Sequence, residues 1–313
     1  MLFLKMRKIF LVTDYNCNNV CISCAKKTEE KGRLSFEQII EKINIIKPSE
    51  KDYIEISGGE PTLREDIIDI CKYIKSNYDT NLIILSNGRR FKDKSFSKQI
   101  KKTGIDRVMT TFYSPDAHTH DLITGKEGSF SDSIQGLKNL EDISVDISIK
   151  TVILKQNYQQ LPEFVSFVSD NFPAAWMSLH GLIMRGRAYD NREQIAIRYK
   201  DIKPYVEKSL DIAIEKNKNL GIAILPSCVV DPMYWQYLSA GWKKMAREMV
   251  YISPEEEFSG SLDVEQHQPK YCSDCLISDD CSWAWESAWK EYITMFGTEE
   301  LSKISKDKVR YEK

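Results

Sequence analysis

Segments with the pattern of a β-strand alternate with helical segments along the first 185 residues of the chain. Six short runs are rich in isoleucine, valine and other apolar residues, as the strands of a buried sheet are. The expected strands are 8–15, 52–59, 81–88, 106–113, 144–154 and 175–184. Because a helix between two strands lets the second strand run in the same direction as the first, this order predicts one parallel sheet with helical crossovers.

The expected helices lie between these strands and carry apolar residues at helical spacing. They span 35–46, 64–78, 95–102, 131–140 and 161–172. The segments after the first three strands contain, in order, three cysteines, a Gly-Gly pair and an Asn-Gly pair. Ligands of parallel sheets bind at the carboxyl ends of the strands. We therefore expect these loops to converge on one site.

The pattern changes after Arg187. A long helix is expected at 203–218, followed by a lone strand at 221–228, a region rich in aromatic and acidic residues, and further cysteines. We therefore divide the chain into residues 1–187, which contain the predicted sheet, and residues 188–313, which form a smaller second domain.

The composition is that of a soluble globular protein, with 42% apolar and 29% charged residues in 313 positions. A formal net charge of −2 gives no indication of nucleic-acid or membrane-surface binding. The apolar N-terminal segment is broken by Lys5, Arg7 and Lys8 and lacks the cleavage site of a signal peptide. We therefore expect a cytoplasmic protein, whose thiols stay reduced.

The eight cysteines are unevenly distributed. Cys71 lies on the apolar face of an expected helix and is interpreted as a core residue. The others fall into an N-terminal triplet, a C-terminal triplet and one isolated residue: Cys17, Cys21 and Cys24; Cys272, Cys275 and Cys281; and Cys228. In a reducing compartment, such groups are more often metal ligands than disulfides.

The N-terminal triplet has the spacing C-x3-C-x2-C, directly after the first expected strand. Clustered thiolates bind iron–sulfur clusters, zinc or cuprous copper. A zinc site would need a fourth ligand, which the sequence does not identify. A four-iron, four-sulfur (4Fe-4S) cluster on three cysteines would leave one iron open to a small molecule.

Together with GGEP after the second strand, this triplet resembles the signature of the radical SAM superfamily. The resemblance extends in order and spacing over about residues 8–190. It implies a partial (β/α)6 barrel related to the TIM barrel, a 4Fe-4S cluster on the three cysteines, and S-adenosylmethionine on the open iron. The GGEP residues implied to bind the methionyl group are Gly58, Gly59, Glu60 and Pro61.

Weaker similarities add three candidates for binding S-adenosylmethionine. The segment 114–130 resembles the family's stretch after the fourth strand, which implies that Ser114, with Tyr113, contacts the ribose. Arg185 and Arg187, in an RGRA motif, are implied to bind a carboxylate of the methionyl group or the substrate, or else form a solvated basic turn. Ser23 departs from the family, which usually has an aromatic residue before the third cysteine. His118 and His120 are interpreted as loop residues.

The C-terminal cysteines, with spacing C-x2-C-x5-C, admit two interpretations. They resemble half of a zinc ribbon, or the SPASM and twitch domains that carry auxiliary iron–sulfur clusters. With Cys228 as fourth ligand, the set of Cys228, Cys272, Cys275 and Cys281 would saturate one auxiliary 4Fe-4S cluster, as in a twitch domain. Without Cys228, one iron would remain open to the substrate.

The resemblance implies an enzyme that reductively cleaves S-adenosylmethionine to a 5′-deoxyadenosyl radical, which abstracts a hydrogen atom from the substrate. Flavodoxin or ferredoxin would donate the electron. We expect oxidative modification or cross-linking of a ribosomally made peptide. Oxidation of a small molecule, or cofactor or natural-product synthesis, is the alternative, and a non-catalytic metal-binding regulator a second one. With Cys17 so near the start, we expect no leader-binding module before it.

Overall fold

The computed structural model describes residues 7–26, 31–238, 248–254, 269–278, 281, 283 and 286–304. In this part of the chain, eight strands form a single sheet in the order β7-β6-β5-β4-β3-β2-β1-β8, and all neighbouring strands are parallel. Their bounds are β1 (Arg7–Val12), β2 (Tyr53–Ser57), β3 (Asn81–Ser86), β4 (Arg107–Thr111), β5 (Asp146–Val152), β6 (Trp176–His180), β7 (Leu220–Ala223) and β8 (Glu248–Ile252).

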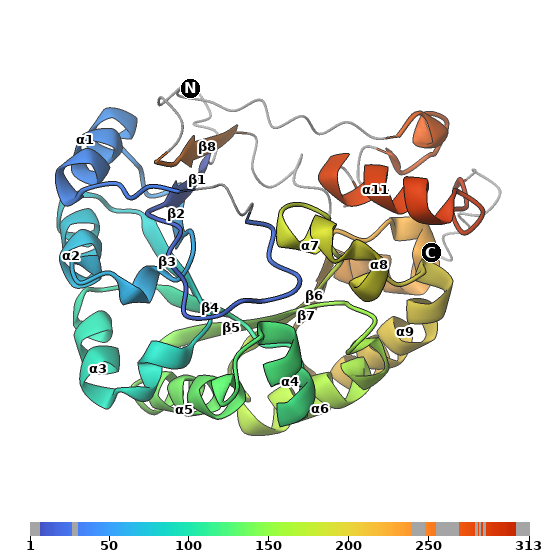
Figure 1. Cartoon of the computed structure of the whole chain (residues 1–313), viewed down its shortest axis with the longest axis horizontal. Coiled ribbons are helices and arrows are strands. Elements are labelled where there is room, and N and C mark those ends of the chain that lie inside the picture. The colour runs from blue at the N-terminus through green and yellow to red at the C-terminus, as the bar shows by residue number, and fades with distance from the viewer. Residues whose placement is uncertain are drawn as a thin grey trace.

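The sheet curves into a partial barrel, with α1, α2, α3, α5, α6 and α9 around its outside and the segment after β1 crossing its inner side (Figure 1). The longer helices are α1 (Phe36–Ile46), α2 (Ile67–Asn77), α3 (Lys94–Lys102), α4 (Ala117–Thr124), α5 (Ser129–Asp142), α6 (Leu161–Asn171), α9 (Tyr199–Glu215) and α11 (Glu286–Phe296). Short helices are η1 (Pro61–Leu63), η2 (Arg89–Lys92), η3 (Tyr158–Gln160), α7 (Arg187–Asp190), α8 (Arg192–Ile195), η4 (Ser227–Val229), η5 (Pro232–Tyr237) and η6 (Lys270–Cys272).

The hydrophobic core lies between the outer face of the sheet and these helices. On β1, Ile9 and Leu11 are fully buried, while the alternate residue Phe10 is half-buried on the inner face. Cys71 of α2 is also fully buried in this core, which confirms its interpretation as a core residue. The parallel α/β sheet and the barrel expected from the sequence are likewise confirmed.

Two strands extend the sheet beyond the six that were expected. Residues 221–228 were expected to form a lone strand, but β7 pairs with β6. Strand β8 pairs with β1 at the opposite edge. An apolar run identifies a strand without identifying its partner, and this prediction was wrong for that reason. The division at Arg187 stays a prediction; β7 and β8 lie beyond it and belong to the same sheet.

The segment that contains His118 and His120 was expected to be a loop, but it forms helix α4. The side chain of Asp116 caps the helix by accepting a hydrogen bond from the Thr119 backbone, and Gly125 ends it in the left-handed conformation. The prediction missed a helix of two turns because its apolar face is short. Among the described residues, no helix combines the length and apolarity needed to cross a membrane.

Candidate functional site

Residues 15–26, called the cysteine loop below, follow β1 and carry the N-terminal triplet. Cys17 is exposed, and Cys21 and Cys24 are half-buried. Backbone and side-chain groups from the segments after β2, β3, β4 and β6 hold the loop, as the following contacts show. The predicted convergence of loops at the carboxyl ends of the strands is therefore confirmed.

Gly58 and Gly59 bring the end of β2 against the start of the cysteine loop. Gly59 donates a backbone hydrogen bond of 2.8 Å to the carbonyl of Asp14, and Glu60 donates one of 2.6 Å to that of Asn16. A Cβ on Gly58 would lie 2.1 Å from the Asp14 carbonyl oxygen, and a Cβ on Gly59 would lie 2.0 Å from that of Asn16. Only glycine permits this approach of two backbones.

Glu60 is buried and joins the segments after β2 and β3. Its Oε1 accepts hydrogen bonds from the Thr62 backbone, the Thr62 hydroxyl and the Ser86 hydroxyl. Its Oε2 accepts one bond of 2.6 Å from the Asn87 backbone. Burial raises the pKa of this carboxyl group, against the hydrogen bonds that lower it. Among the described residues, Oε2 accepts only this bond, so it retains capacity for a further donor. The adjoining Pro61 begins η1.

The segment after β3 contributes two residues that the sequence analysis did not single out. The amide of Asn87 donates to the side-chain oxygen of Asn18, and the guanidinium of Arg89 donates to the Asn18 carbonyl and the Asn19 side chain. Arg89 also pairs with Asp132 of α5 at 3.1 Å. The Asn-Gly pair pointed to this segment, but no periodicity indicates which loop an arginine will reach.

The C-terminal end of α4 holds the middle of the cysteine loop. Val20 donates a backbone hydrogen bond of 2.8 Å to Thr124, and Ile22 donates one of 2.9 Å to Ile123. Gly125 packs so closely that a Cβ there would lie 2.8 Å from the Val20 carbonyl oxygen. The backbone N–H groups of Val20 and Ile22 thus bind carbonyl groups at the end of α4 and fix the middle of the cysteine loop there.

The RGRA segment after β6 holds the end of the cysteine loop. Arg187 donates a hydrogen bond of 3.2 Å from Nη1 to the carbonyl of Cys21, and the Ala188 backbone donates one of 3.0 Å to that of Cys24. The side chain of Arg187 therefore binds the backbone of the cysteine loop. Arg185 lies two residues earlier and donates its backbone N–H to the carbonyl of Ile183.

Ser23, the residue before the third cysteine of the triplet, is buried against Tyr113. The two hydroxyl groups are 2.9 Å apart. Tyr113 is thereby bound to the cysteine loop. The neighbouring Ser114 is fully buried; its hydroxyl donates to the Gln160 side chain and accepts from the Asp116 backbone.

The three thiols share one electrostatic environment. Burial raises the pKa of Cys21 to about 12, with further contributions from Cys24 and Cys17. Burial also raises the pKa of Cys17, which accepts a backbone hydrogen bond of 3.4 Å from Asn19 on its sulfur. Thiols whose pKa is raised, as that of Cys17 and that of Cys21 are, ionise readily only beside a positive charge. A bound metal cluster supplies such a charge.

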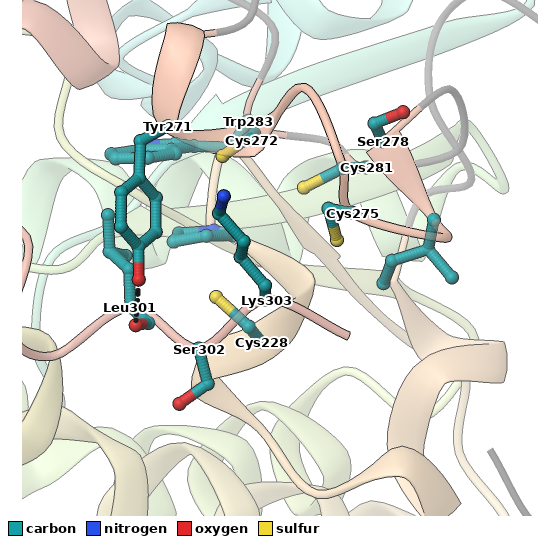
Figure 2. A pocket seen from close by; sticks show the side chains of 12 residues that line it. Cys228, Tyr271, Cys272, Cys275, Ser278, Cys281, Trp283, Leu301, Ser302 and Lys303 are labelled. Carbon is teal, nitrogen blue, oxygen red and sulfur yellow. Dashed lines mark hydrogen bonds between the residues drawn. The ribbon is translucent and has the colours of Figure 1, made fainter. Parts of the chain in front are cut away.

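The C-terminal triplet and Cys228 line a single pocket, which Figure 2 shows with Lys303 among the four thiols. Cys228 lies in η4, after β7, and Cys272 ends η6. Burial raises the pKa of each of these two thiols to about 11, with contributions from the other cysteines of the pocket. Cys228 and the C-terminal triplet are more than forty positions apart in the chain, and they thus line the same pocket.

Donors surround the sulfur atoms of this pocket. The Ser227 backbone donates to the sulfur of Cys281 at 3.4 Å, and the Ile304 backbone donates to that of Cys275 at 3.5 Å. Lys303 lowers the pKa of Cys272 in opposition to its burial. Within the described residues, no three His, Cys, Asp or Glu side chains converge tightly enough to hold one metal ion. A 4Fe-4S cluster places its thiolates farther apart, because each binds a different iron.

Comparison with known families supports the interpretation of the first site. A model of the Radical SAM superfamily matches residues 12–168, from the end of β1 to α6. This match covers half of the chain. The chain belongs to the radical SAM superfamily. It is therefore an enzyme, and the alternative of a non-catalytic regulator is not retained. Radical SAM membership implies a 4Fe-4S cluster and S-adenosylmethionine.

Relatives of this radical SAM enzyme have different named activities. A probable GTP 3',8-cyclase of Saccharolobus islandicus is 26% identical over 221 residues, which are 68% of this chain and 69% of the relative. Mycofactocin maturase MftC of Mycolicibacterium smegmatis is 28% identical over 158 residues, which are 50% of this chain and 40% of MftC. Neither similarity identifies the substrate of this chain.

Among solved structures, SuiB of Streptococcus suis has the same fold. Its complex with S-adenosylmethionine superimposes with a TM-score of 0.63 and 15% identity, over 91% of this chain and 74% of SuiB. Its complex with the precursor peptide SuiA superimposes with a TM-score of 0.55 and 18% identity, over 69% of this chain and 48% of SuiB. In that comparison, the chain spans about half the length of SuiB. At this identity the similarity concerns the fold alone.

Proposed function

We propose that this radical SAM enzyme carries one auxiliary 4Fe-4S cluster and oxidatively modifies or cross-links a ribosomally made peptide. The observation that carries the proposal is the pocket lined by four cysteines from two distant segments. Four thiolates saturate one cluster. A single auxiliary cluster on a C-terminal segment is the arrangement of a twitch domain, which we assign to residues 188–313.

In this proposal, Cys17, Cys21 and Cys24 bind the first cluster and leave one iron for S-adenosylmethionine. When bound, the first cluster and S-adenosylmethionine together would supply a 5′-deoxyadenosyl radical that abstracts a hydrogen atom from the substrate. Glu60 offers its second oxygen, Oε2, to the ammonium of the methionyl group. Gly58, Gly59 and Pro61 hold that carboxylate beside the cysteine loop, and Arg187 holds the loop itself.

We assign the auxiliary cluster to Cys228, Cys272, Cys275 and Cys281. Its environment fits an anionic group with delocalised negative charge, because backbone N–H groups donate to two of the sulfurs and Lys303 lies among them. Such donors raise the reduction potential of an iron–sulfur cluster. The cluster would supply one-electron redox capacity near the substrate site.

Two substrate classes have support from named relatives. The peptide is favoured by the maturase MftC and by SuiB, whose structure contains a precursor peptide. A small molecule is favoured by the GTP 3',8-cyclases, which match a larger share of this chain than MftC does. We place the reaction in the cytoplasm, where flavodoxin or ferredoxin would donate the electron. Ser114 and Arg185 remain proposed contacts of S-adenosylmethionine.

Iron analysis of cysteine variants tests the cluster count. After anaerobic reconstitution, we expect about eight irons per chain in the wild type, from two 4Fe-4S clusters, and about four after alanine replacement of either cysteine group. The variant without Cys17, Cys21 and Cys24 should release no 5′-deoxyadenosine with dithionite and S-adenosylmethionine. Cys71→Ala is the matched control and should lose no iron. Zinc, or no metal, in the variant without Cys17, Cys21 and Cys24 would contradict the auxiliary cluster.

The substrate class requires a second measurement. Incubation with a candidate precursor peptide should give a product lighter by two hydrogen atoms, as measured by mass spectrometry. Turnover of a nucleotide or another small molecule, with no change in the peptide, would favour the alternative function. Both results presuppose wild-type enzyme that cleaves S-adenosylmethionine.

A further inference from the structure

The side chains of Ser23 and Tyr113 are buried beside a cysteine of the first cluster site. Ser23 lies between Cys21 and Cys24 in the chain, and the exposed fractions of Ser23 and Tyr113 are only 8% and 7%. Their hydroxyl oxygens are 2.9 Å apart. Cys21 packs against the small apolar cluster that contains Tyr113, and its sulfur is a hydrogen-bond partner of the Tyr113 hydroxyl. Two hydroxyl groups and one thiol thus share an enclosed space.

The backbone of Tyr113 is fixed on both sides. Its N–H donates a hydrogen bond of 3.3 Å to Nδ1 of His120, and its carbonyl accepts one of 2.9 Å from the side-chain amide of Asn157. His120 is itself buried and packs on the ring of Phe112, with 4.7 Å between the ring centroids. Because interiors are close-packed, a buried ring on an anchored backbone has little freedom to move. The Tyr113 hydroxyl is therefore held at the cysteine loop.

The cysteine loop is fixed on the other side of this contact. The carbonyl of Cys21 accepts a hydrogen bond of 3.2 Å from Arg187, and the Ile22 backbone donates one of 2.9 Å to Ile123. These two bonds hold the residues just before Ser23. The contact between the two hydroxyl groups and the thiol is therefore built from two rigid parts of the molecule.

We infer that Ser23 and Tyr113 form a chain of hydrogen bonds that ends on the sulfur of Cys21 when this cysteine binds the first cluster. A cysteine that binds iron has lost its proton, so its sulfur can only accept. The single proton of the Tyr113 hydroxyl then goes to the sulfur, and the Ser23 hydroxyl donates to the Tyr113 oxygen. Bonds arranged in this order strengthen one another.

The consequence of this chain is a higher reduction potential of the first cluster. Reduction adds one negative charge, part of which lies on the sulfurs, and a donor to a sulfur therefore stabilises the reduced state more than the oxidised state. Ser23 and Tyr113 act through Cys21 and are positioning residues. The inference assigns the Tyr113 hydroxyl to the cluster, not to the ribose as the resemblance implied. It needs neither the auxiliary cluster nor the peptide substrate.

A redox titration of the reconstituted full-length enzyme, followed by electron paramagnetic resonance, tests the chain. The signal of the first cluster is identified by its change when S-adenosylmethionine is added. Tyr113→Phe keeps the ring and loses the hydroxyl. We expect its one-electron reduction constant to fall roughly three- to tenfold, which lowers the midpoint potential by about 30 to 60 mV. Tyr73→Phe also loses one hydroxyl hydrogen bond, to Asn44 between α1 and α2, and is the control.

Variants of Ser23 test the other end of the chain and leave the Tyr113 ring in place. Ser23→Ala should lower the potential by less than Tyr113→Phe, because Tyr113 still donates to the sulfur, and Ser23→Thr should retain the wild-type potential. A merely structural role would change the iron content and leave the potential of the loaded enzyme unchanged.

Two results would overturn the inference. One is a Tyr113→Phe enzyme with the iron content of the wild type and a potential equal to that of Tyr73→Phe. If Tyr113→Phe loses its iron, Ser23→Ala decides, and a potential equal to that of the wild type is the second contrary result. Since the potential is measured without substrate, failure of the peptide proposal would leave the inference unchanged.

Discussion

At the scale of single residues, the Gly-Gly pair has a structural role that its resemblance to a ligand-binding motif did not reveal. We expected Gly58 and Gly59 to let the backbone approach S-adenosylmethionine. In the structure, they let it approach the carbonyl groups of Asp14 and Asn16. The motif therefore positions the cysteine loop, and a contact of the glycines with the methionyl group stays a proposal.

Gly59→Ala tests this role. The new Cβ would lie 2.0 Å from the Asn16 carbonyl oxygen, so one of the two backbones must move. We expect a loss of unfolding free energy of about 3 kcal/mol, measured by urea denaturation, and a lower iron content after reconstitution.

Gly221→Ala is the matched control, because a Cβ there makes only ordinary contact, at 3.8 Å from Trp176. If Gly59→Ala were as stable and as rich in iron as Gly221→Ala, the positioning role would be wrong.

At the scale of elements, the turn between α4 and α5 supports the helix end that holds the cysteine loop. Asp121 in α4 accepts hydrogen bonds from the Gly128 backbone at 2.6 Å, the Ser129 hydroxyl at 2.8 Å and the Phe130 backbone at 2.8 Å. It therefore caps α5 from the preceding helix and closes the turn. The loop depends on this turn through Val20 and Thr124.

Asp121→Asn should cost about 1–2 kcal/mol of unfolding free energy at pH 7, since an amide cannot accept all three bonds. Burial raises the pKa of Asp121, but the three hydrogen bonds outweigh it and leave this pKa below its usual value. A lowered pKa contributes stability above the pKa of the unfolded chain, about 3.9, and this is lost as the pH falls through the folded value.

The difference between wild type and Asp121→Asn should therefore be complete at pH 7 and begin to shrink near pH 4, in urea denaturation at several pH values. Asp142→Asn, at the exposed end of α5, should cost nothing measurable. A difference that is independent of pH would show that the carboxylate charge plays no part.

At the scale of the whole molecule, a polar junction around Glu300 helps to attach the C-terminal segment to the barrel. The hydroxyl of Tyr292 in α11 accepts a hydrogen bond from the Tyr199 backbone at the start of α9 and donates to Glu300. Arg198 pairs with the other oxygen of Glu300 at 2.9 Å. The stacked rings of Tyr199 and Tyr292, 3.8 Å apart, complete the contact.

Glu300→Gln should loosen this attachment, because the amide cannot accept from both Tyr292 and Arg198 with full charge. We expect faster hydrogen exchange in residues 286–304, roughly tenfold if about 1.4 kcal/mol is lost, and unchanged exchange in the central strands β2 to β5. Glu299→Gln, one position earlier and exposed, is the control. Equal exchange in both variants would show that Glu300 does not anchor the segment.

The sequence alone was sufficient for the first six strands of the sheet, the family and the two cysteine groups. Apolar period and length identify β1 to β6, because each strand is buried on its outer face by the helix that follows it. The spacing of Cys17, Cys21 and Cys24 and the GGEP motif are local, and local patterns are readable without a structure. Helix α4 was missed, since a short helix is specified by its two caps rather than by a long period.

Only the tertiary structure decided which distant groups meet. It joined β7 and β8 to the sheet, placed Arg187 on the carbonyl of Cys21 and bonded Ser23 to Tyr113. It also brought Cys228 to the pocket of the C-terminal triplet and paired Lys8 of β1 with Glu55 of β2. Such contacts depend on the curvature of the sheet and on the paths of its loops. The residues that meet there are far apart in the chain, and no local sequence pattern indicates that they are neighbours.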